Sequence, residues 1–412
     1  MNACRNLFSL LILIKALFNW KALCLFSFIL VSGLSWGESL DATAWKILQE
    51  SPGYRSELYS TESEVASLQS AGNLPDLEIG GEYLVAPVSE DNRWAAELSW
   101  GLEWPGVYGA RNRESDKKAA VARLQLDAKR RESFIEIKNL LLDYIQCRKK
   151  IQLLEELNLS NDTIYRLAEQ SAKGGEMTLL DLNKVKIENA NVRGSKAALL
   201  DEEAGIINSL SEIYGGDCAP LLAPMECEFP LPVLPEENQI ETWKKWSPEV
   251  LAANAEAQAA LQSSNVAKME ALPSLSVGYK HAYEEGTHFN GALLGISIPI
   301  FSSRHKQKAA KAEILSAEFK AETAATAAET EIRGLYKRLD LMISQITEIA
   351  PLVENEDYAA TLMKAYQAGV ITLIDYLTER NYFTTAALDL INLRHAAAKT
   401  SLQLQKYLPL PN

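Results

Sequence analysis

Lys173–Asp181 reads KGGEMTLLD, and Gln367–Asp375 reads QAGVITLID. The two stretches are offset by 194 residues (from 173 to 367), and the dipeptides Trp104-Pro105 and Ile298-Pro299 are offset by the same 194 residues. Two landmarks therefore keep a constant spacing in both halves of the chain. A long internal repeat fixes the architecture. Because there are only two copies, we predict one molecule built from two similar halves.

Composition excludes several classes of function. The chain of 412 residues carries a net charge of −13, which makes it a poor nucleic-acid binder because phosphate contacts need clustered Lys and Arg. The sequence has no Gly-x-Ser-x-Gly, no phosphate-binding Gly-Lys-Ser loop and no His-Glu-x-x-His. We therefore expect no nucleic-acid partner, no enzymatic activity and no cofactor.

The N-terminus has the pattern of a targeting segment. Basic residues precede the apolar run Ala22–Val31, and Ser35 and Gly37 are small residues at the positions that a signal peptidase reads. This pattern predicts a cleaved signal peptide at residues 1–37. An inner-membrane anchor is the alternative, because Leu7–Phe18 adds a second apolar block.

The cysteines allow two further possibilities. Cys24 could suggest lipidation, but the residues before it are a poor lead-in and the apolar run continues past it. Cys218 and Cys227 could form a disulfide in an oxidising compartment, and spacing alone does not decide whether they do.

Four segments alternate between apolar and polar residues, the period of a β-strand with one apolar face. In the clearest of them Trp94, Trp100 and Trp104 fall on one face, while glutamates fall on the other. We predict two hairpins, with strands at 74–85, 94–104, 275–283 and 292–298.

Very long helices follow each hairpin. Residues 108–171 contain no proline and predict a helix of about 96 Å at 1.5 Å per residue. Glycines after Lys173 end that helix, and Thr178 and Asp181 form a box-like start for the returning helix. The second half repeats the plan with a helix at 302–367, possibly kinked at Pro351, and a returning helix at 372–407.

These elements predict the domain organisation. After the signal peptide, the first repeat spans residues 38–216 and the second spans 247–412. A proline-rich linker at 217–246 joins them.

Four strands cannot close a barrel, and open sheet edges are not tolerated in lipid. If the sheet enters a membrane, two chains would pool eight strands and three would pool twelve. The apolar face, with Trp94, Trp100 and Trp104, would then face lipid. The opposite face would line the lumen, with Glu78, Glu82, Glu97 and Glu103. A soluble sheet that caps a coiled coil is the alternative.

The repeated unit of strands, proline, long helix, Gly-x-x-Thr-Leu-Leu-Asp turn and returning helix resembles the TolC-like outer-membrane efflux protein family. The stretch Glu103–Arg111, EWPGVYGAR, resembles the family's strand-to-helix corner and is most similar to the heavy-metal and cation efflux branch. The resemblance implies a mainly α fold with a small β part: a homotrimer with a 12-stranded β-barrel in the outer-membrane lipid and a long periplasmic helical barrel. It implies a passive conduit for metal cations or small toxic solutes, which works with a periplasmic adaptor protein and an inner-membrane pump.

The resemblance also implies site residues at the periplasmic tip, where the adaptor docks. These are Gly175, Thr178, Leu179, Asp181, Gly369, Thr372, Leu373 and Asp375. The pore constriction would involve Asp375, Asp181 and Tyr366. Ile371 stands where the best-studied gate has an arginine and Thr378 replaces a second acidic residue, so a simpler constriction is expected. Both aspartates also have a purely local role, as acidic residues in the first turn of a helix.

Two other functions remain open from the sequence. One is a periplasmic coiled-coil adaptor or scaffold, and the other is the outer-membrane channel of a protein secretion system. Metal binding by the chain is not expected, because no pair among His281, His288, His305 and His395 has helical i, i+4 ligand spacing.

Overall fold

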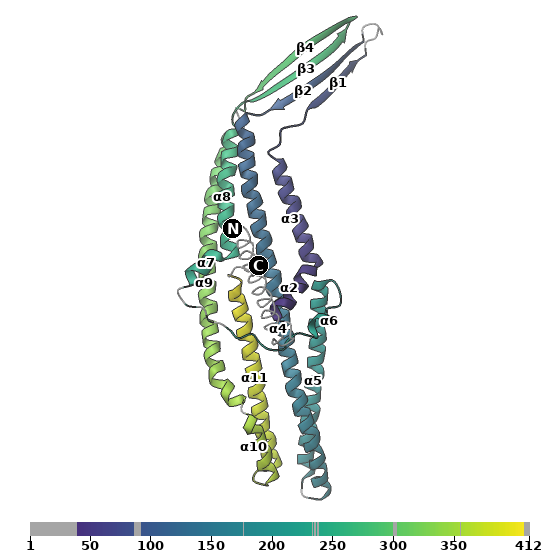
Figure 1. The fold of residues 1–412 in the computed structure, drawn as a ribbon, viewed down its shortest axis with the longest axis vertical. Helices are drawn as coiled ribbons and strands as arrows, with labels where there is room; N and C mark the ends of the chain where they lie inside the picture. The colour runs from purple at the N-terminus through teal and green to yellow at the C-terminus, as the bar shows by residue number, and fades with distance from the viewer. Residues whose placement is uncertain are drawn as a thin grey trace, which may run out of the picture.

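The computed structural model describes residues 39–407, with the exception of 86–91, 176, 233, 235, 237, 238, 300–302 and 355. The expected signal peptide lies outside the described residues. The molecule is elongated, with a sheet at one end, long helices along its length and two helical hairpin tips at the other end (Figure 1). In the described part of the chain, no helix combines the length and apolar character needed to cross a membrane.

The order of elements repeats. The first half contains α2 (Leu40–Glu50), α3 (Pro52–Ser70), β1 (Glu78–Leu84), β2 (Arg93–Leu102), α4 (Pro105–Lys173) and α5 (Leu179–Tyr214). A short helix α6 (Ala219–Leu222) follows. The second half contains α7 (Ile240–Trp246), α8 (Pro248–Met269), β3 (Ser274–Glu284), β4 (Thr287–Ser297), α9 (Ser303–Val353), α10 (Glu356–Gln367) and α11 (Leu373–Gln405).

The four strands form one antiparallel sheet in the order β1-β2-β3-β4. The two hairpins are distant in sequence and are joined by antiparallel pairing of β2 with β3, in which Trp94 lies opposite Tyr283. Strands β1 and β4 are the edges, so each presents a row of unpaired backbone groups.

Local sequence explains where the long helices begin and end. The 69 residues of α4 span about 104 Å at 1.5 Å per residue. Pro105 opens α4, since a proline at the first helical position loses no helical hydrogen bond. Helix α5 ends at Gly215, whose φ of 78° is the left-handed conformation of a helix C-cap.

The long helix expected at 302–367 is two helices. Helix α9 contains Pro351 in its last turn and ends at Val353, and α10 begins at Glu356. Proline removes one backbone donor and crowds the carbonyl four residues before it, yet α9 continues for two residues past Pro351, so the interruption lies beyond the proline.

Among the residues that the structure describes, the helices form three hydrophobic clusters instead of one core. One packs α2, α4 and α5 around Ile137 and Leu141, a second packs α7, α9 and α11 around Ile332 and Leu339, and the third joins the hairpin tips. A long, thin molecule buries its apolar side chains in successive layers between neighbouring helices.

The cysteines in the described part of the chain are free. Cys218 is buried in the first cluster, where burial raises the pKa of its thiol to about 11, and Cys227 packs against the same cluster. Cys147 is buried in α4 and donates to the carbonyl of Leu199, so it is a structural thiol.

A carboxylate between α4 and α11 gives the fold a pH dependence. Asp143 Oδ1 lies 2.7 Å from His395 Nε2 and 2.6 Å from Lys399 Nζ. Burial alone would raise the pKa of Asp143, but the hydrogen bonds from His395 and Lys399 outweigh burial and hold the pKa below its usual value. The carboxylate therefore stabilises the fold above about pH 4, and this contribution is lost as pH falls through the lowered pKa.

We expect Asp143→Asn to lower the unfolding temperature at pH 7 and to lose most of that effect near pH 3. Circular dichroism melts at both pH values check this. Asp389→Asn, which changes an exposed carboxylate on the same α11, is the matched control. An equal loss for Asp143→Asn at both pH values would contradict the assignment.

Candidate functional site

Both hairpin tips turn on a glycine with a left-handed backbone. Gly175 has a φ of 78° and Gly369 a φ of 71°. Residues with a Cβ rarely adopt this conformation, so each glycine lets a long helix end within the turn.

The next helix of each tip begins with a threonine cap. Thr178 Oγ1 accepts a hydrogen bond from the backbone N–H of Asp181, at 3.1 Å. At the second tip the cap is reciprocal: Thr372 Oγ1 accepts from the N–H of Asp375 at 3.2 Å, and Asp375 Oδ2 accepts from the N–H of Thr372 at 3.1 Å. Asp375 therefore caps its helix, whereas the carboxylate of Asp181 lies in the first turn and accepts from the hydroxyl of Thr178.

The two aspartates differ in their charged neighbours. Hydrogen bonds from Thr178 and Lys184 lower the pKa of Asp181, whose Oδ1 lies 3.2 Å from Lys184 Nζ. Hydrogen bonds from Thr372 lower the pKa of Asp375. Among the described residues, Asp375 forms no ion pair with a basic side chain. Its charge is therefore the less neutralised of the two, and it is exposed.

The tips pack against each other. A cluster joins Ile164 and Leu182 of the first hairpin to Tyr376 and Leu377 of α11. Leu373 is buried in this cluster, whereas its counterpart Leu179 is 75 % exposed. Sequence reasoning treated the two leucines alike, because their positions in the repeat are equivalent. It also missed two exposed apolar residues at the tips, Leu180 and Val370.

Two further side chains lie beside the tip cluster. Tyr366 is half-buried, with its ring centroid 5.5 Å from that of Tyr376. Arg380 of α11 is buried, and its Nε and Nη1 atoms have no hydrogen-bond partner. Burial lowers the pKa of Arg380, while Tyr376 and Glu188 act in the opposite direction. No pattern in the sequence indicated Arg380, because its burial depends on how α5 and α11 pack.

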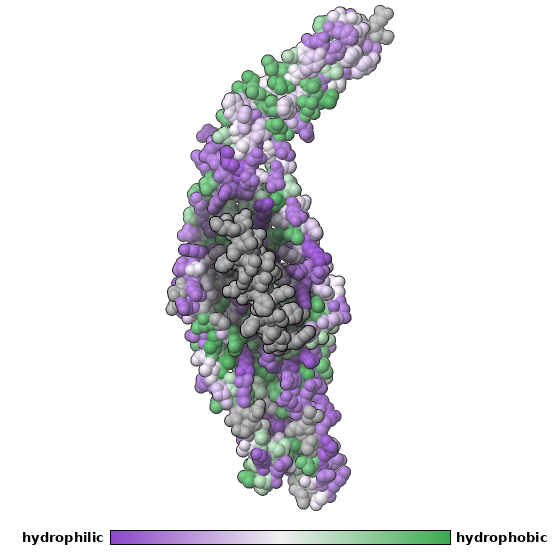
Figure 2. All heavy atoms as spheres, viewed as in Figure 1, coloured by the Kyte–Doolittle hydropathy of each residue, from purple (hydrophilic) through white to green (hydrophobic). Residues whose placement is uncertain are grey.

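One face of the sheet is mainly apolar on all four strands, with His281, His288 and Asn290 near its outer end. Residues directly opposite in an antiparallel pair share a face. Trp94 is opposite Tyr83 and Tyr283, and Trp100 is opposite Val277. Figure 2 shows apolar residues gathered over the sheet near the helices, with polar residues at its outer end and over much of the helical body.

Trp104 does not belong to a strand. It follows the end of β2, precedes α4 and is 49 % exposed. Its indole therefore lies at the corner between the sheet and the helices, whereas Trp94 lies near the opposite end of the sheet.

The other face of the sheet carries the expected glutamates. Glu78 and Glu82 lie on β1, and Glu97 lies on β2 between Gly80 and Lys280. Lys280 was not among the expected site residues, and it places a positive charge on this face directly opposite Glu97. The acidic character therefore depends mainly on Glu78 and Glu82.

Glu103 lies apart from the other three glutamates. It follows the last residue of β2. Arg111 bridges two carboxylates here: its Nη2 lies 2.8 Å from Glu103 Oε2 and 2.9 Å from Glu270 Oε1. This ion-pair network ties the strand-to-helix corner to the end of α8.

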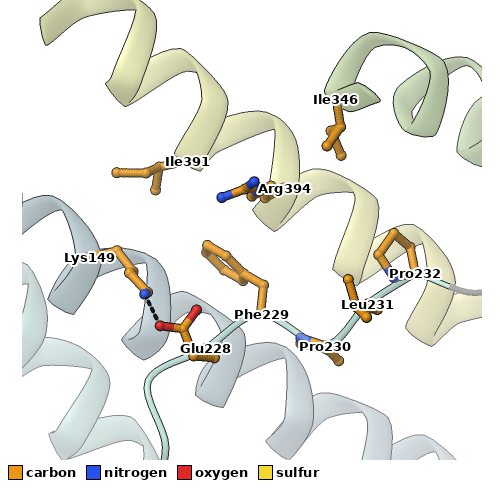
Figure 3. A pocket seen from close by; sticks show the side chains of 9 residues that line it. All are labelled: Lys149, Glu228, Phe229, Pro230, Leu231, Pro232, Ile346, Ile391 and Arg394. Carbon is orange, nitrogen blue, oxygen red and sulfur yellow. Dashed lines mark hydrogen bonds and ion pairs between the residues drawn. The ribbon is translucent and has the colours of Figure 1, made fainter. Parts of the chain in front are cut away.

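A surface pocket lies midway along the helices, where the segment between the two halves crosses α4 and α11. Phe229 and Leu231 of this segment line it together with Ile391 and Arg394 of α11, and Lys149 of α4 forms an ion pair with Glu228 (Figure 3). The contacts fix the path of the crossing segment. The described residues that line the pocket form no arrangement of groups that indicates catalysis.

Comparison with known proteins identifies this architecture. A family model described as outer membrane efflux protein matches residues 240–409. No curated protein sequence matches the chain significantly.

Solved structures match nearly the whole chain. A membrane protein from Pseudomonas aeruginosa has a TM-score of 0.77 at 18 % identity, over 90 % of this chain and 93 % of that one. The outer membrane channel CmeC of Campylobacter jejuni has a TM-score of 0.72 at 16 % identity, over 89 % and 85 %. The open state of the MtrE outer membrane channel of Neisseria gonorrhoeae has a TM-score of 0.73 at 13 % identity, over 90 % and 88 %.

The structural matches show a shared fold, and the family model covers most of the second half of the chain. The description of that model, outer membrane efflux protein, agrees with the expected outer-membrane location and names no catalytic activity. Residues 240–409 match the family model of outer membrane efflux proteins, and the chain as a whole has the fold of the TolC-like outer-membrane channels.

Proposed function

We propose that three copies of this chain form the outer-membrane conduit of a tripartite efflux system. The conduit is passive and carries metal cations or small toxic solutes, which a periplasmic adaptor and an inner-membrane pump deliver to it. The single observation that supports this most strongly is the four-stranded sheet, which has one apolar face and two open edges.

Lipid offers no hydrogen bonds to the backbone of an edge strand. An apolar sheet face in the outer membrane therefore needs β4 of one chain to pair with β1 of the next. Two chains would supply eight strands, which enclose little more than their own side chains, and three would supply twelve and a water-filled lumen. The trimer follows from the need for a conduit.

Mass determination of the detergent-solubilised protein, together with conductance in planar bilayers, tests this proposal. A mass of three chains and discrete conductance steps are expected. A monomer that stays soluble without detergent, once residues 1–37 are removed, would favour the adaptor or scaffold function instead.

The proposed cargo follows from the polar face of the sheet. Glu78 and Glu82 of each chain would give the lumen a negative potential, reduced at Glu97 by Lys280. Such a lumen favours cations. The reversal potential in a salt gradient measures this preference, and anion selectivity would reject it.

At the periplasmic tip we propose that Asp375 forms a ring of three carboxylates that narrows the pore. We expect Asp375→Ala to raise single-channel conductance and to weaken block by multivalent cations, because the ring attracts and holds such ions. Bilayer recordings with a trivalent blocker measure both effects.

Thr372→Ala is the matched control for Asp375→Ala. It removes the same helix cap, which contributes about 1 kcal/mol, and leaves the carboxylate in place. If both variants change block equally, the effect comes from the cap. If neither changes conductance or block, the proposed constriction at Asp375 is wrong.

The proposed docking surface for the adaptor includes the exposed Leu179 at the first tip. Its exposed neighbour Leu180 and Val370 at the second tip add apolar area to the same end of the molecule. Leu373 would contribute to docking indirectly, because its buried side chain packs in the cluster that joins the two tips.

A further inference from the structure

Two histidines from different strands meet on the apolar face of the sheet, near its outer end. His281 of β3 lies opposite Asn290 of β4, and His288 lies two residues before Asn290. Side chains in this diagonal relation across an antiparallel pair are within reach of each other. His288 Nδ1 lies 3.2 Å from His281 Nε2.

A hydrogen bond fixes which nitrogen of His281 is available. Its Nδ1 lies 2.7 Å from Asn290 Oδ1, and the hydroxyl of Tyr279 donates to the same oxygen at 2.6 Å. An amide oxygen only accepts hydrogen bonds, so His281 Nδ1 carries the proton and Nε2 presents its lone pair toward His288. Histidines that bind metals have this arrangement, with the second nitrogen bonded to an oxygen.

We propose that His281 and His288 form a binding site for a divalent transition metal ion such as Cu²⁺, Ni²⁺ or Zn²⁺. Imidazole is a preferred ligand of these ions. With metal–nitrogen bonds of about 2.0–2.1 Å, nitrogens 3.2 Å apart subtend an angle of about 100–106° at the metal, between the octahedral and tetrahedral values.

Binding requires one small rearrangement. The ring of His288 is exposed, so rotation of its side chain turns Nδ1 toward a metal shared with His281. The proton on His288 Nδ1 moves to Nε2, and the imidazole remains neutral throughout. The described residues offer no group of three His, Cys, Asp or Glu side chains, so water completes the coordination and the ion exchanges readily.

The site is separate from the proposed conduit. It lies on the apolar face, whereas Glu78, Glu82 and Glu97 lie on the other face. A metal ion held there would link β3 to β4 close to their connecting turn and stabilise the folded hairpin by binding to it. The sequence did not indicate this pair because the two histidines are ligands across strands and not along a helix.

Trp94 provides a local reporter, because its ring lies 5.2 Å from that of His281. The whole protein, purified in detergent without a polyhistidine tag, is titrated with CuCl₂ by calorimetry and by tryptophan fluorescence. We expect saturable binding of one ion per chain and quenching of fluorescence. Trp94→Phe should keep the heat of binding and lose most of the quenching.

His281→Asn and His288→Asn should each abolish saturable binding, and Asn290→Ala should weaken it about tenfold by releasing the ring of His281. His305→Asn, which removes an exposed histidine on α9, is the matched control and should bind like the wild type. If His281→Asn does not fold, binding by His288→Asn tests the proposal, because His288 is exposed and its replacement should not disturb folding. Binding unchanged in His288→Asn, or reduced equally in His305→Asn, overturns the proposal. Calorimetry measures metal binding independently of conductance. A negative result in calorimetry therefore rejects the metal site alone, and a negative result in conductance rejects the conduit alone.

Discussion

Replacing Leu294 with arginine is expected to prevent stable insertion of the protein in the outer membrane. Leu294 is 85 % exposed and lies on the apolar face of β4, opposite Val277. An arginine on the lipid face near the middle of a membrane strand costs about 2–4 kcal/mol. A trimer would carry that cost three times. The quantity to measure is the amount of heat-modifiable trimer in the outer-membrane fraction, compared with the wild type.

Leu293→Arg is the matched control for Leu294→Arg. Leu293 is the neighbouring residue in β4 and lies opposite Gly278, on the face with the glutamates. The same arginine there would face the lumen, where it should alter ion selectivity and leave assembly intact. Equal loss of trimer in the two variants, or full assembly of Leu294→Arg, would show that the apolar face does not contact lipid.

Replacing Gly278 with valine should push β2 away from β3 and destabilise the sheet. A Cβ at Gly278 would lie 2.8 Å from the carbonyl oxygen of Leu98 and 3.3 Å from the Cα of Ser99. Overpacking typically costs about 1–3 kcal/mol, and here the crowded atoms are backbone, which cannot move aside as a side chain would. The thermal dissociation temperature of the purified oligomer measures the loss.

Gly291→Val isolates the steric effect. Gly291 lies on the same face in the adjacent strand, opposite Lys280, and a Cβ there meets nothing within 4 Å. Valine favours strands, so this variant should assemble at least as well as the wild type. A similar loss of dissociation temperature in both variants would contradict the close approach of β2 and β3 at Gly278.

Local sequence patterns predict the order of elements and the turns at both tips. The period of two around Trp94 and Trp100 indicated a strand with one apolar face, and the repeated glycine, threonine and aspartate indicated where long helices end and returning helices begin. These are local properties, because backbone conformation at Gly175 or Gly369 and the cap at Thr372 involve residues only a few positions apart.

Which residues of each pattern contact a neighbouring element depends on tertiary packing. Leu179 and Leu373 occupy equivalent positions in the repeat, yet one is exposed and the other is buried against the first hairpin. Lys280 opposite Glu97 and His288 beside His281 both depend on strand register, which pairs residues far apart in the sequence or across a turn. Periodicity assigns a residue to a face, but contacts between faces are set by how the strands and helices pack together.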